Sequence, residues 1–362
     1  MITFEQLNLD NSSECGRWDM FCADTQSAWF WHTTPWLRYQ LLYNPKLGSQ
    51  NFSFTVNQNS KPVAVVPLFV ENQEYGKTFT FGGGPLPQAA IDIVTDFPQV
   101  MDKINERINL LAYDLKSDYI QIQRSPLCCP NSGQQTEMQP WGYTPIPFQS
   151  HVVNILPEQE MRKYMRKGHL SDVKTGLRQL ECYVITGDSL YLNEAFSRYI
   201  TTHYLAAGRV TRPETTFALQ MEWIKSGLAM LVGAKHGDRW VGFDYVFLYQ
   251  SMAYYGSACI DPDYRHFPIG HVLQWKIFEW LYDHDYVVYD MGLPSPYGPL
   301  SYDVPTDKQL GIARFKRGFG GKSTTVWRWE KFFTEAAFRR VQQERNEAYA
   351  KAVWGWKAAS SN

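Results

Sequence analysis

Hydrophobic and polar positions follow the same order twice along the chain. In the first half, Phe52–Val56, a polar turn and Val63–Phe69 predict a β-hairpin. In the second half, Ala229–Ala234, a polar turn and Trp240–Leu248 predict another. Each hairpin follows a segment of helical period and precedes a further strand. The chain is therefore expected to repeat one α/β plan at a spacing of roughly 175 residues.

The segment between the two halves predicts a domain boundary. Residues 125–147 are rich in Pro, Gly, Asn, Gln and Ser, as is typical of a long surface loop. We therefore expect a first domain over 1–150 and a second over 151–330. Residues 331–362 have the period of a C-terminal helix.

Composition restricts the classes of partner. The 362 residues are 44% hydrophobic and carry a net charge of −1, so no overall field favours DNA or an anionic membrane. The first residues lack the charge and apolar run of a signal peptide, and the longest apolar run, Val63–Val70, is too short for a bilayer span. Six scattered cysteines without metal spacing fit reduced thiols in a cytoplasmic protein with no metal site.

Two cation-rich segments are candidate anion sites. Arg314–Gly321 holds three cations, two aromatic residues and three glycines, which predict a turn whose backbone N–H groups cradle an anion. A β-turn with solvated charges is the alternative. Glu158–Leu180 has helical period and carries six Lys or Arg residues. That helix is either a wall for a phosphate-bearing donor or an ordinary solvated face.

A third segment combines a strand, a turn and a helix. The strand around Tyr254 and Tyr255 ends at a turn with Arg265 and Gly270, and an amphipathic helix follows before the strand that ends at Asp290. The free N–H groups and the positive dipole end of a helix N-terminus favour anions.

This segment resembles the pyrophosphate-binding strand, loop and helix of the GNAT acyltransferase fold. Together with the repeated plan, the helix over Arg166–Arg178, the strand end at Asp290–Gly292 and the Phe315–Gly318 turn, it resembles the FemAB-like family over about Trp29–Trp329. The resemblance implies an α/β (α+β) fold of two tandem GNAT-like domains with mixed sheets. It also implies an enzyme that transfers an acyl or aminoacyl group to an amine.

The resemblance departs from the coenzyme A pattern at one loop. Coenzyme-A-binding GNAT proteins place two glycines after the basic residue, whereas Arg265–Gly270 has one glycine and a proline, which lacks an N–H. The acyl donor is therefore either aminoacyl-tRNA or acyl-coenzyme A, and no permanently bound cofactor is expected.

By the same resemblance, Lys316 with Phe315 stabilises the oxyanion of the tetrahedral intermediate, a role in which a fixed cation contributes several kcal/mol. The remaining residues predicted to bind substrate are Trp36, Arg38, Tyr254, Tyr255, Arg265, Gly270, Asp290, Tyr297 and Asp303. Arg38 corresponds by position to a cation for the acceptor's phosphate, or is an ordinary helix arginine. The general base stays open among Asp290, Asp303, Asp307, His203, His271 and Tyr254, unless the substrate itself serves.

The favoured function is acyl or aminoacyl transfer to an amine of a cell-envelope precursor, small or lipid-linked, or of a related small metabolite. One alternative is acetyl-coenzyme-A-dependent N-acetylation of an amino sugar. Another is a non-catalytic module that binds tRNA or a nucleotide-linked sugar.

Overall fold

The computed structural model describes residues 1–362 except 75, 93–95, 129–137, 293–303 and 356–362. The described residues form two compact units. The first takes in those within Met1–Gln149, Pro294–Ala313 and Thr325–Asn362, and the second those within Ser150–Leu293 and Arg314–Thr324. Compactness does not show that a unit folds independently, so the domain limits at residues 150 and 330 stay a prediction.

The first unit contains two sheets. One is antiparallel in the order β1 (Ile2–Gln6), β3 (Phe54–Gln58), β4 (Lys61–Val66) and β8 (Ala90–Ile91). The other is mixed, because β6 and β7 run parallel to β9 while the other pairs are antiparallel. Its strands are β2 (Gln50–Asn51), β5 (Phe69–Gln73), β6 (Gly76–Phe79), β7 (Leu86–Pro87), β9 (Ser117–Gln123) and β16 (Lys322–Phe332), which pairs with β9 from Arg328.

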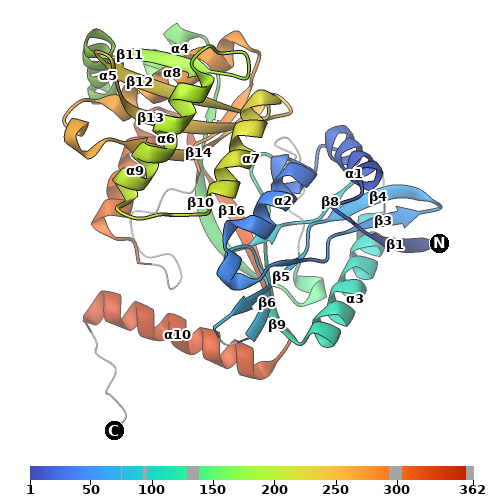
Figure 1. Ribbon diagram of the computed structural model, residues 1–362. Helices are drawn as coiled ribbons and strands as arrows, with labels where there is room; N and C mark the ends of the chain where they lie inside the picture. Colours follow the sequence, from blue (N-terminus) through green and yellow to red (C-terminus); the bar gives the residue numbers. More distant parts are fainter. Residues whose placement is uncertain (75, 93–95, 129–137, 293–303, 356–362) are drawn as a thin grey trace. The chain divides into compact units, whose positions relative to one another are not determined.

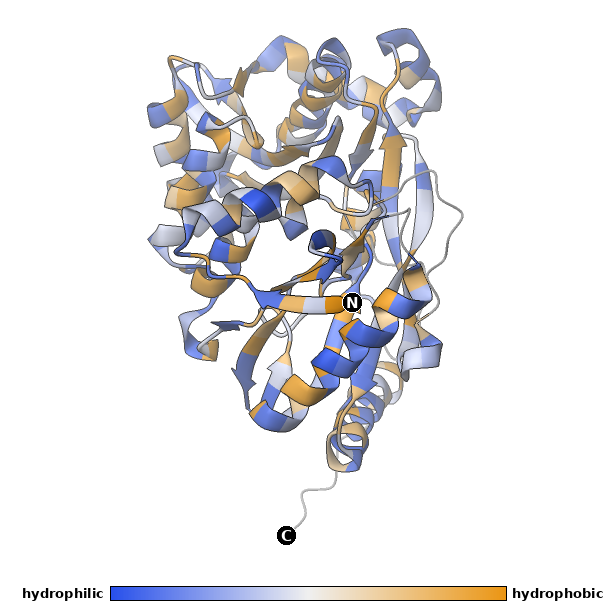
Figure 2. Cartoon of the chain, turned by 90° about the vertical axis from the view of Figure 1, so that its right-hand side faces the viewer, coloured by the Kyte–Doolittle hydropathy of each residue, from blue (hydrophilic) through white to orange (hydrophobic). Residues whose placement is uncertain are grey.

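The helix α3 (Phe97–Leu115) buries one apolar face in this unit. Asp96 caps its first turn, and Val100, Ile104 and Ile108 are buried. Hydrophobic and hydrophilic positions alternate along the helices, as this packing requires (Figure 2). The other helices and 3-10 turns are α1 (Ser12–Asp24), η1 (Phe30–His32), α2 (Thr34–Tyr43), η2 (Pro45–Leu47), η3 (Gln139–Trp141) and α10 (Glu335–Trp354).

The second unit is built on six strands of a mixed sheet (Figure 1). Its order is β11 (Glu181–Ile185), β12 (Ala229–His236), β13 (Arg239–Tyr249), β14 (Met252–Ile260), β15 (Val288–Asp290) and the end of β10 (Thr144–Asn154). Only β14 and β15 are parallel among these strands. Around it lie α4 (Glu158–Tyr164), α5 (Lys167–Gln179), α6 (Leu192–Ala207), α7 (Glu214–Lys225), η4 (Pro262–Tyr264) and α8 (Ile269–Asp283).

Both faces of this sheet are covered. Neighbouring residues of a strand point to opposite faces. Gln274 of α8 donates a hydrogen bond to Asp244, whereas the next residue, Tyr245, donates to the Gln220 carbonyl of α7. The helices α8 and α7 therefore lie on opposite faces of β13.

The structure confirms most of the predicted elements. Both hairpins form, as β3–β4 and β12–β13, and α8 buries Leu273, Ile277 and Leu281 as predicted. The basic segment is two helices, α4 and α5, since Met165 and Arg166 between them have extended backbone. The predicted turn at Arg314 is wrong, because Arg314–Arg317 is the last turn of the helix α9 (Asp307–Arg317).

Candidate functional site

The candidate site begins where two parallel strands separate. Tyr254 of β14 is in register with Asp290 of β15, after which β15 ends while β14 continues to Ile260. The chain turns at Gly292, which has a φ of +79° and closely approaches two side chains. A methyl group on Gly292 would lie 3.2 Å from Tyr254 Oη and 3.3 Å from Lys316 Nζ. A lysine, a tyrosine and a buried carboxyl therefore meet at this separation.

Lys316 is the cation of this cluster. Burial lowers the pKa of its ammonium group to about 8, against the opposing effect of the Asp290 carboxylate. Its Nζ lies 5.5 Å from the centroid of the Tyr255 ring. A partly desolvated ammonium interacts more strongly with a developing negative charge than a solvated one does.

Asp290 is held by two hydrogen-bond donors. Its Oδ1 accepts from the Ser150 hydroxyl and, at 2.8 Å, from the Gly292 N–H. Burial raises the pKa of the Asp290 carboxyl to about 6, although these donors and Lys316 favour its charged form. Asp290 therefore balances the charge of Lys316.

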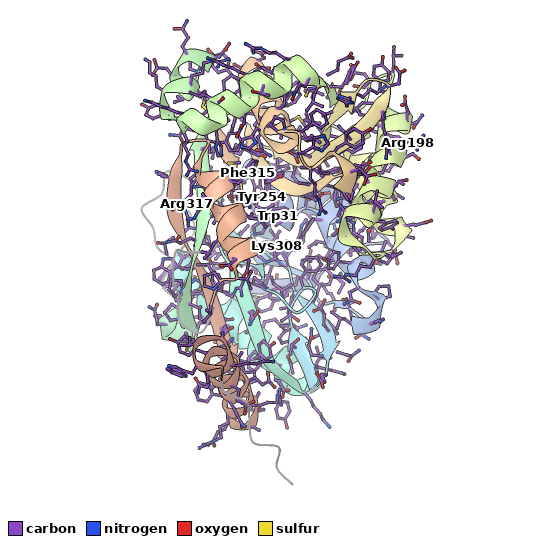
Figure 3. All side chains as sticks on the ribbon, turned by 90° about the vertical axis from the view of Figure 1, so that its left-hand side faces the viewer. Trp31, Arg198, Tyr254, Lys308, Phe315 and Arg317 are labelled. Atoms are coloured by element: carbon purple, nitrogen blue, oxygen red, sulfur yellow. The ribbon has the colours of Figure 1, made fainter. Side chains whose placement is uncertain are left out.

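The backbone after Lys316 does not form the predicted anion cradle. Helix C-termini present carbonyl oxygens, and here the Phe315 carbonyl accepts from the Gly318 N–H and lies 2.9 Å from His169 Nε2. Gly318 serves packing instead, because a methyl group there would lie 2.0 Å from His169 Nε2. The side chains of α9, of which Phe315 and Arg317 are visible in Figure 3, supply the chemistry at this end of the helix.

A cavity of about 630 Å³ lies in the second unit and is lined by five of the predicted residues: Tyr255, Arg265, Gly270, Phe315 and the candidate base His271. Its wall is completed by α5, β13, β14 and the start of α8. The lining residues are Asp172, Thr175, Gln179, Asp244, Tyr255, Ala258, Ile260, the continuous stretch from Arg265 to His271, and Phe315.

The start of α8 offers little to a pyrophosphate. The N–H groups of Ile269, His271 and Val272 donate to the carbonyls of Phe267 and Pro268, and proline has no N–H. A methyl group on Gly270 would lie 3.3 Å from Phe315 Cζ, so the aromatic ring already packs on this helix end.

Asp244 is a residue of the cavity wall that the sequence analysis missed. It is 1% exposed, and its two oxygens accept from Gln274 Nε2 at 2.8 Å and from the Tyr255 hydroxyl at 3.2 Å. Burial raises the pKa of its carboxyl to about 7, while both hydrogen bonds oppose that shift. The sequence does contain a signal, since an acidic residue interrupts the apolar run Trp240–Leu248.

Two of the residues predicted to bind substrate, Trp36 and Arg38, lie in the first unit. Trp36 belongs to an aromatic cluster, 4.5 Å from the Trp31 ring and stacked 5.0 Å from Tyr39. Arg38 donates to the Leu9 carbonyl at 2.6 Å. Tyr297 and Asp303 lie outside the described residues, so their roles stay predictions.

The histidines named as candidate bases are placed in packed surroundings. Burial lowers the pKa of His203 and of His271 to about 4 each, so both are neutral near pH 7. His203 Nε2 lies 3.0 Å from Thr211 Oγ1, and the His271 ring packs against Phe315. Asp307 is an exposed residue in the first turn of α9.

The basic segment divides into paired and exposed cations. Arg162 pairs with Glu158 and covers the Trp275 ring, and Lys163 pairs with Glu160. Four further cations are exposed: Arg166, Lys167, Lys174 and Arg178. Three of them, at 167, 174 and 178, fall on one stripe of α5, beside the face that lines the cavity.

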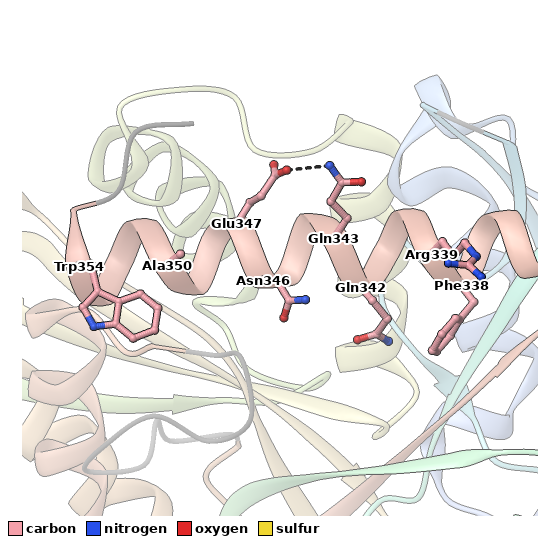
Figure 4. Close-up of a pocket in the computed structure, with 8 residues that line it drawn as sticks. All are labelled: Phe338, Arg339, Gln342, Gln343, Asn346, Glu347, Ala350 and Trp354. Carbon is pink, nitrogen blue, oxygen red and sulfur yellow. Dashed lines mark hydrogen bonds between the residues drawn. The ribbon is translucent and has the colours of Figure 1, made fainter. Parts of the chain in front are cut away.

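A second hollow, of about 830 Å³, follows one face of α10 (Figure 4). Phe338, Gln342, Asn346 and Trp354 line it, and Gln343 donates to Glu347 across the helix. A surface lined by a single helix lacks the converging polar groups of a binding site.

Among the described residues, no group of three or more His, Cys, Asp or Glu side chains could hold a metal ion. No helix in the described part of the chain is long and apolar enough to cross a membrane.

Part of the chain matches a known protein family. Residues 175–317 match the family described as Acetyltransferase (GNAT) domain. No protein of curated function matches the chain significantly in sequence.

Solved structures resemble the chain in fold at low identity. FemX superposes with a TM-score of 0.65 at 11% identity, covering 94% of this chain and 100% of FemX. A tandem GNAT protein from the clavulanic acid biosynthesis pathway superposes with a TM-score of 0.52 at 11% identity, covering 92% of this chain and 99% of that protein. L-PGS from Bacillus licheniformis superposes with a TM-score of 0.53 at 13% identity, covering 85% of this chain and 95% of L-PGS. The predicted fold class is confirmed: residues 175–317 match the GNAT domain model, and the chain has the fold of FemX and of a tandem GNAT protein.

Proposed function

We propose that this protein is an acyltransferase that moves an acyl or aminoacyl group to an amine of a cell-envelope precursor or of a related small metabolite. The observation that carries the proposal is the position of Lys316, whose partly buried ammonium group lies beside Gly292 and Tyr254, where β14 and β15 separate. Attack of an amine on an ester or thioester places negative charge on the carbonyl oxygen. A fixed cation there stabilises the transition state more than the ground state.

The start of α8 supports aminoacyl-tRNA as the donor. Coenzyme A would need free N–H groups for its pyrophosphate, and three of those near Pro268 already donate within the protein. The exposed cations of α5 suit a nucleic acid backbone. The expectation of an envelope acceptor comes from the resemblance of the sequence to the FemAB-like family.

Acetyl-coenzyme A is the second candidate donor. The tandem GNAT neighbour is described as a structure without AcCoA, which associates that protein with acetyl-coenzyme A. In this chain, the cavity of about 630 Å³ has room for an acyl-bearing arm. The acceptor would then be an amino sugar or another small amine. A cytoplasmic setting, consistent with the reduced thiols of Cys15, Cys22, Cys128, Cys182 and Cys259, is part of this proposal.

The test compares two donors and two lysine variants. Purified protein is incubated with charged tRNA or with acetyl-coenzyme A and a panel of amines, and products are identified by mass spectrometry. Lys316→Ala should lower turnover at least 10²-fold, as expected for loss of an oxyanion-stabilising group. Lys308→Ala is the matched control, since Lys308 is exposed at the other end of α9 (Figure 3).

Three outcomes separate the readings. Turnover with charged tRNA alone supports aminoacyl transfer, and turnover with acetyl-coenzyme A supports the second donor. Absence of any product, together with tRNA or nucleotide-sugar binding that Lys316→Ala weakens, supports a non-catalytic module and contradicts the proposal.

A further inference from the structure

A buried carboxyl and a tyrosine hydroxyl form a connected pair in the cavity wall. Asp244 of β13 and Tyr255 of β14 both line the cavity, and the Tyr255 hydroxyl donates to Asp244 Oδ1 at 3.2 Å. The residues on either side of Asp244 in β13, Phe243 and Tyr245, are fully buried. A carboxyl in such a strand reduces stability unless its hydrogen bonds are made, so its presence requires an explanation.

The hydrogen bonds around Asp244 fix its orientation. Tyr289 of β15 donates to Gln274 Oε1 at 3.2 Å, which leaves the amide nitrogen of Gln274 to donate to Asp244 Oδ2 at 2.8 Å. One carboxyl oxygen is thus held by Gln274 and the other faces Tyr255. The Oδ1 atom of Asp244 is therefore placed to exchange a proton with Tyr255.

Asp172, Arg265, His266 and His271 line the same cavity as Asp244. Four further titratable groups interact electrostatically with Asp244 and do not change charge near neutral pH. They are Cys182 on β11, Cys259 and Tyr255 on β14 and Tyr289 on β15. Burial raises the pKa of each thiol and hydroxyl, so all four are neutral there. Asp244 is the group among these five that can accept a proton.

Tyr255 connects this pair to the proposed oxyanion site. The Lys316 ammonium lies 5.5 Å from the centroid of the Tyr255 ring, whose hydroxyl faces Asp244. The other carboxyl nearby, Asp290, accepts hydrogen bonds from Ser150 and Gly292 and stabilises the charged form of Lys316. We therefore assign Asp290 to charge balance and not to proton transfer.

We propose that Tyr255 and Asp244 form the proton-accepting device of the acyl transfer, an inference that rests on the proposed function. The amine nitrogen forms the C–N bond, and the C–O or C–S bond to the carrier breaks with its electron pair on the leaving oxygen or sulfur. The amine proton passes to the Tyr255 oxygen as the Tyr255 proton passes to Asp244. The leaving group takes a proton from solvent, and Asp244 later returns its proton to solvent through the cavity. Tyr255 is the catalytic residue, and Asp244 acts through it.

The test measures kcat/KM against pH with the donor and amine that the panel identifies. Asp244→Asn and Tyr255→Phe should each lower kcat/KM by 10²- to 10⁴-fold, and both should remove the rise of the rate toward neutral pH. Asp283→Asn, an exposed carboxyl at the end of α8, should leave rate and profile unchanged. Asp290→Asn should lower the rate but keep the rise.

A second measurement separates the possible failures. Carboxyl-selective ¹³C NMR of the whole protein, assigned with Asp244→Asn, should show Asp244 titrating near pH 7 and shifting in Tyr255→Phe. An Asp244 that is ionised from pH 5 upward, or a Tyr255→Phe variant with the normal pH profile, overturns the inference while leaving the acyltransferase intact. Absence of turnover with every donor overturns the proposed function, and this role of the pair with it.

Discussion

Replacing Lys316 by methionine should stabilise the protein while removing its activity. Methionine keeps the unbranched shape of the side chain but removes its charge. In the folded protein, burial lowers the pKa of Lys316 to about 8, whereas an unfolded lysine titrates near 10.4. Between these two values the unfolded chain binds more protons than the folded one, so the stability of the wild type rises with pH across this interval.

The size of the effect follows from the shift. At about 1.4 kcal/mol per pH unit, the charged lysine reduces the free energy of unfolding by about 3 kcal/mol at pH 7. The loss of the charge partner of Asp290 and of the contact with the Tyr255 ring reduces the gain. We expect Lys316→Met to be about 2 kcal/mol more stable than the wild type at pH 7. At pH 10 the variant should be more stable by less than about 1 kcal/mol.

Urea unfolding at pH 7 and at pH 10 measures both values. Lys308→Met is the control, because an exposed lysine should change stability by less than about 0.5 kcal/mol at either pH. A Lys316→Met variant that is less stable than the wild type at pH 7, or a gain that does not shrink at pH 10, would refute the desolvation of Lys316.

Two further predictions concern packing and a buried ion pair. Gly318→Ala should cost about 1–3 kcal/mol in thermal unfolding, since its methyl group would overlap the ring of His169. Gly311→Ala, at a position of α9 with open space around it, should stabilise the protein by about 0.5–1 kcal/mol, and equal effects of the two substitutions would contradict the packing argument. Arg345→Met should lower the free energy of unfolding by about 3–5 kcal/mol, because Arg345 lies 2.5 Å from Glu330, whose side chain is 2% exposed. Recovery of stability in a variant that also carries Glu330→Met would identify the unpaired Glu330 charge as the cause.

The sequence predicted the strands and α8 because their periodicity reflects burial. The hairpin β12–β13 is a continuous apolar run on both sides of a polar turn, and such a run fits a strand that is covered on both faces. The turn predicted at Arg314 was wrong for a local reason. Cations in a last turn followed by glycine are typical of a helix C-terminus, whereas three clustered glycines by themselves favour a turn.

The site could be predicted only in part. The resemblance to a family named Lys316, and the structure places its ammonium group beside Tyr254 and Asp290. Asp244 could not be assigned to the site, because its partners Gln274 and Tyr255 come from a helix and a strand that meet it only in the folded sheet. A single acidic residue in an apolar run indicates a buried polar group but does not name its partners.

The two proposed roles in proton and charge chemistry require opposite protonation states. Asp244 must be ionised to accept the proton, and burial raises its pKa to about 7, so the rate should rise with pH up to that value. Lys316 must keep its proton to stabilise the oxyanion, and burial lowers its pKa to about 8, so the rate should fall above that value. These two pKa shifts narrow the pH interval in which Asp244 is ionised and Lys316 is protonated. The plot of kcat/KM against pH should therefore be bell-shaped, with its maximum between about pH 7 and pH 8. Asp244→Asn should remove the rising limb and leave the falling one. A wild-type profile that stays flat from pH 6 to pH 10 would contradict both roles, since neither group would then titrate in the free enzyme.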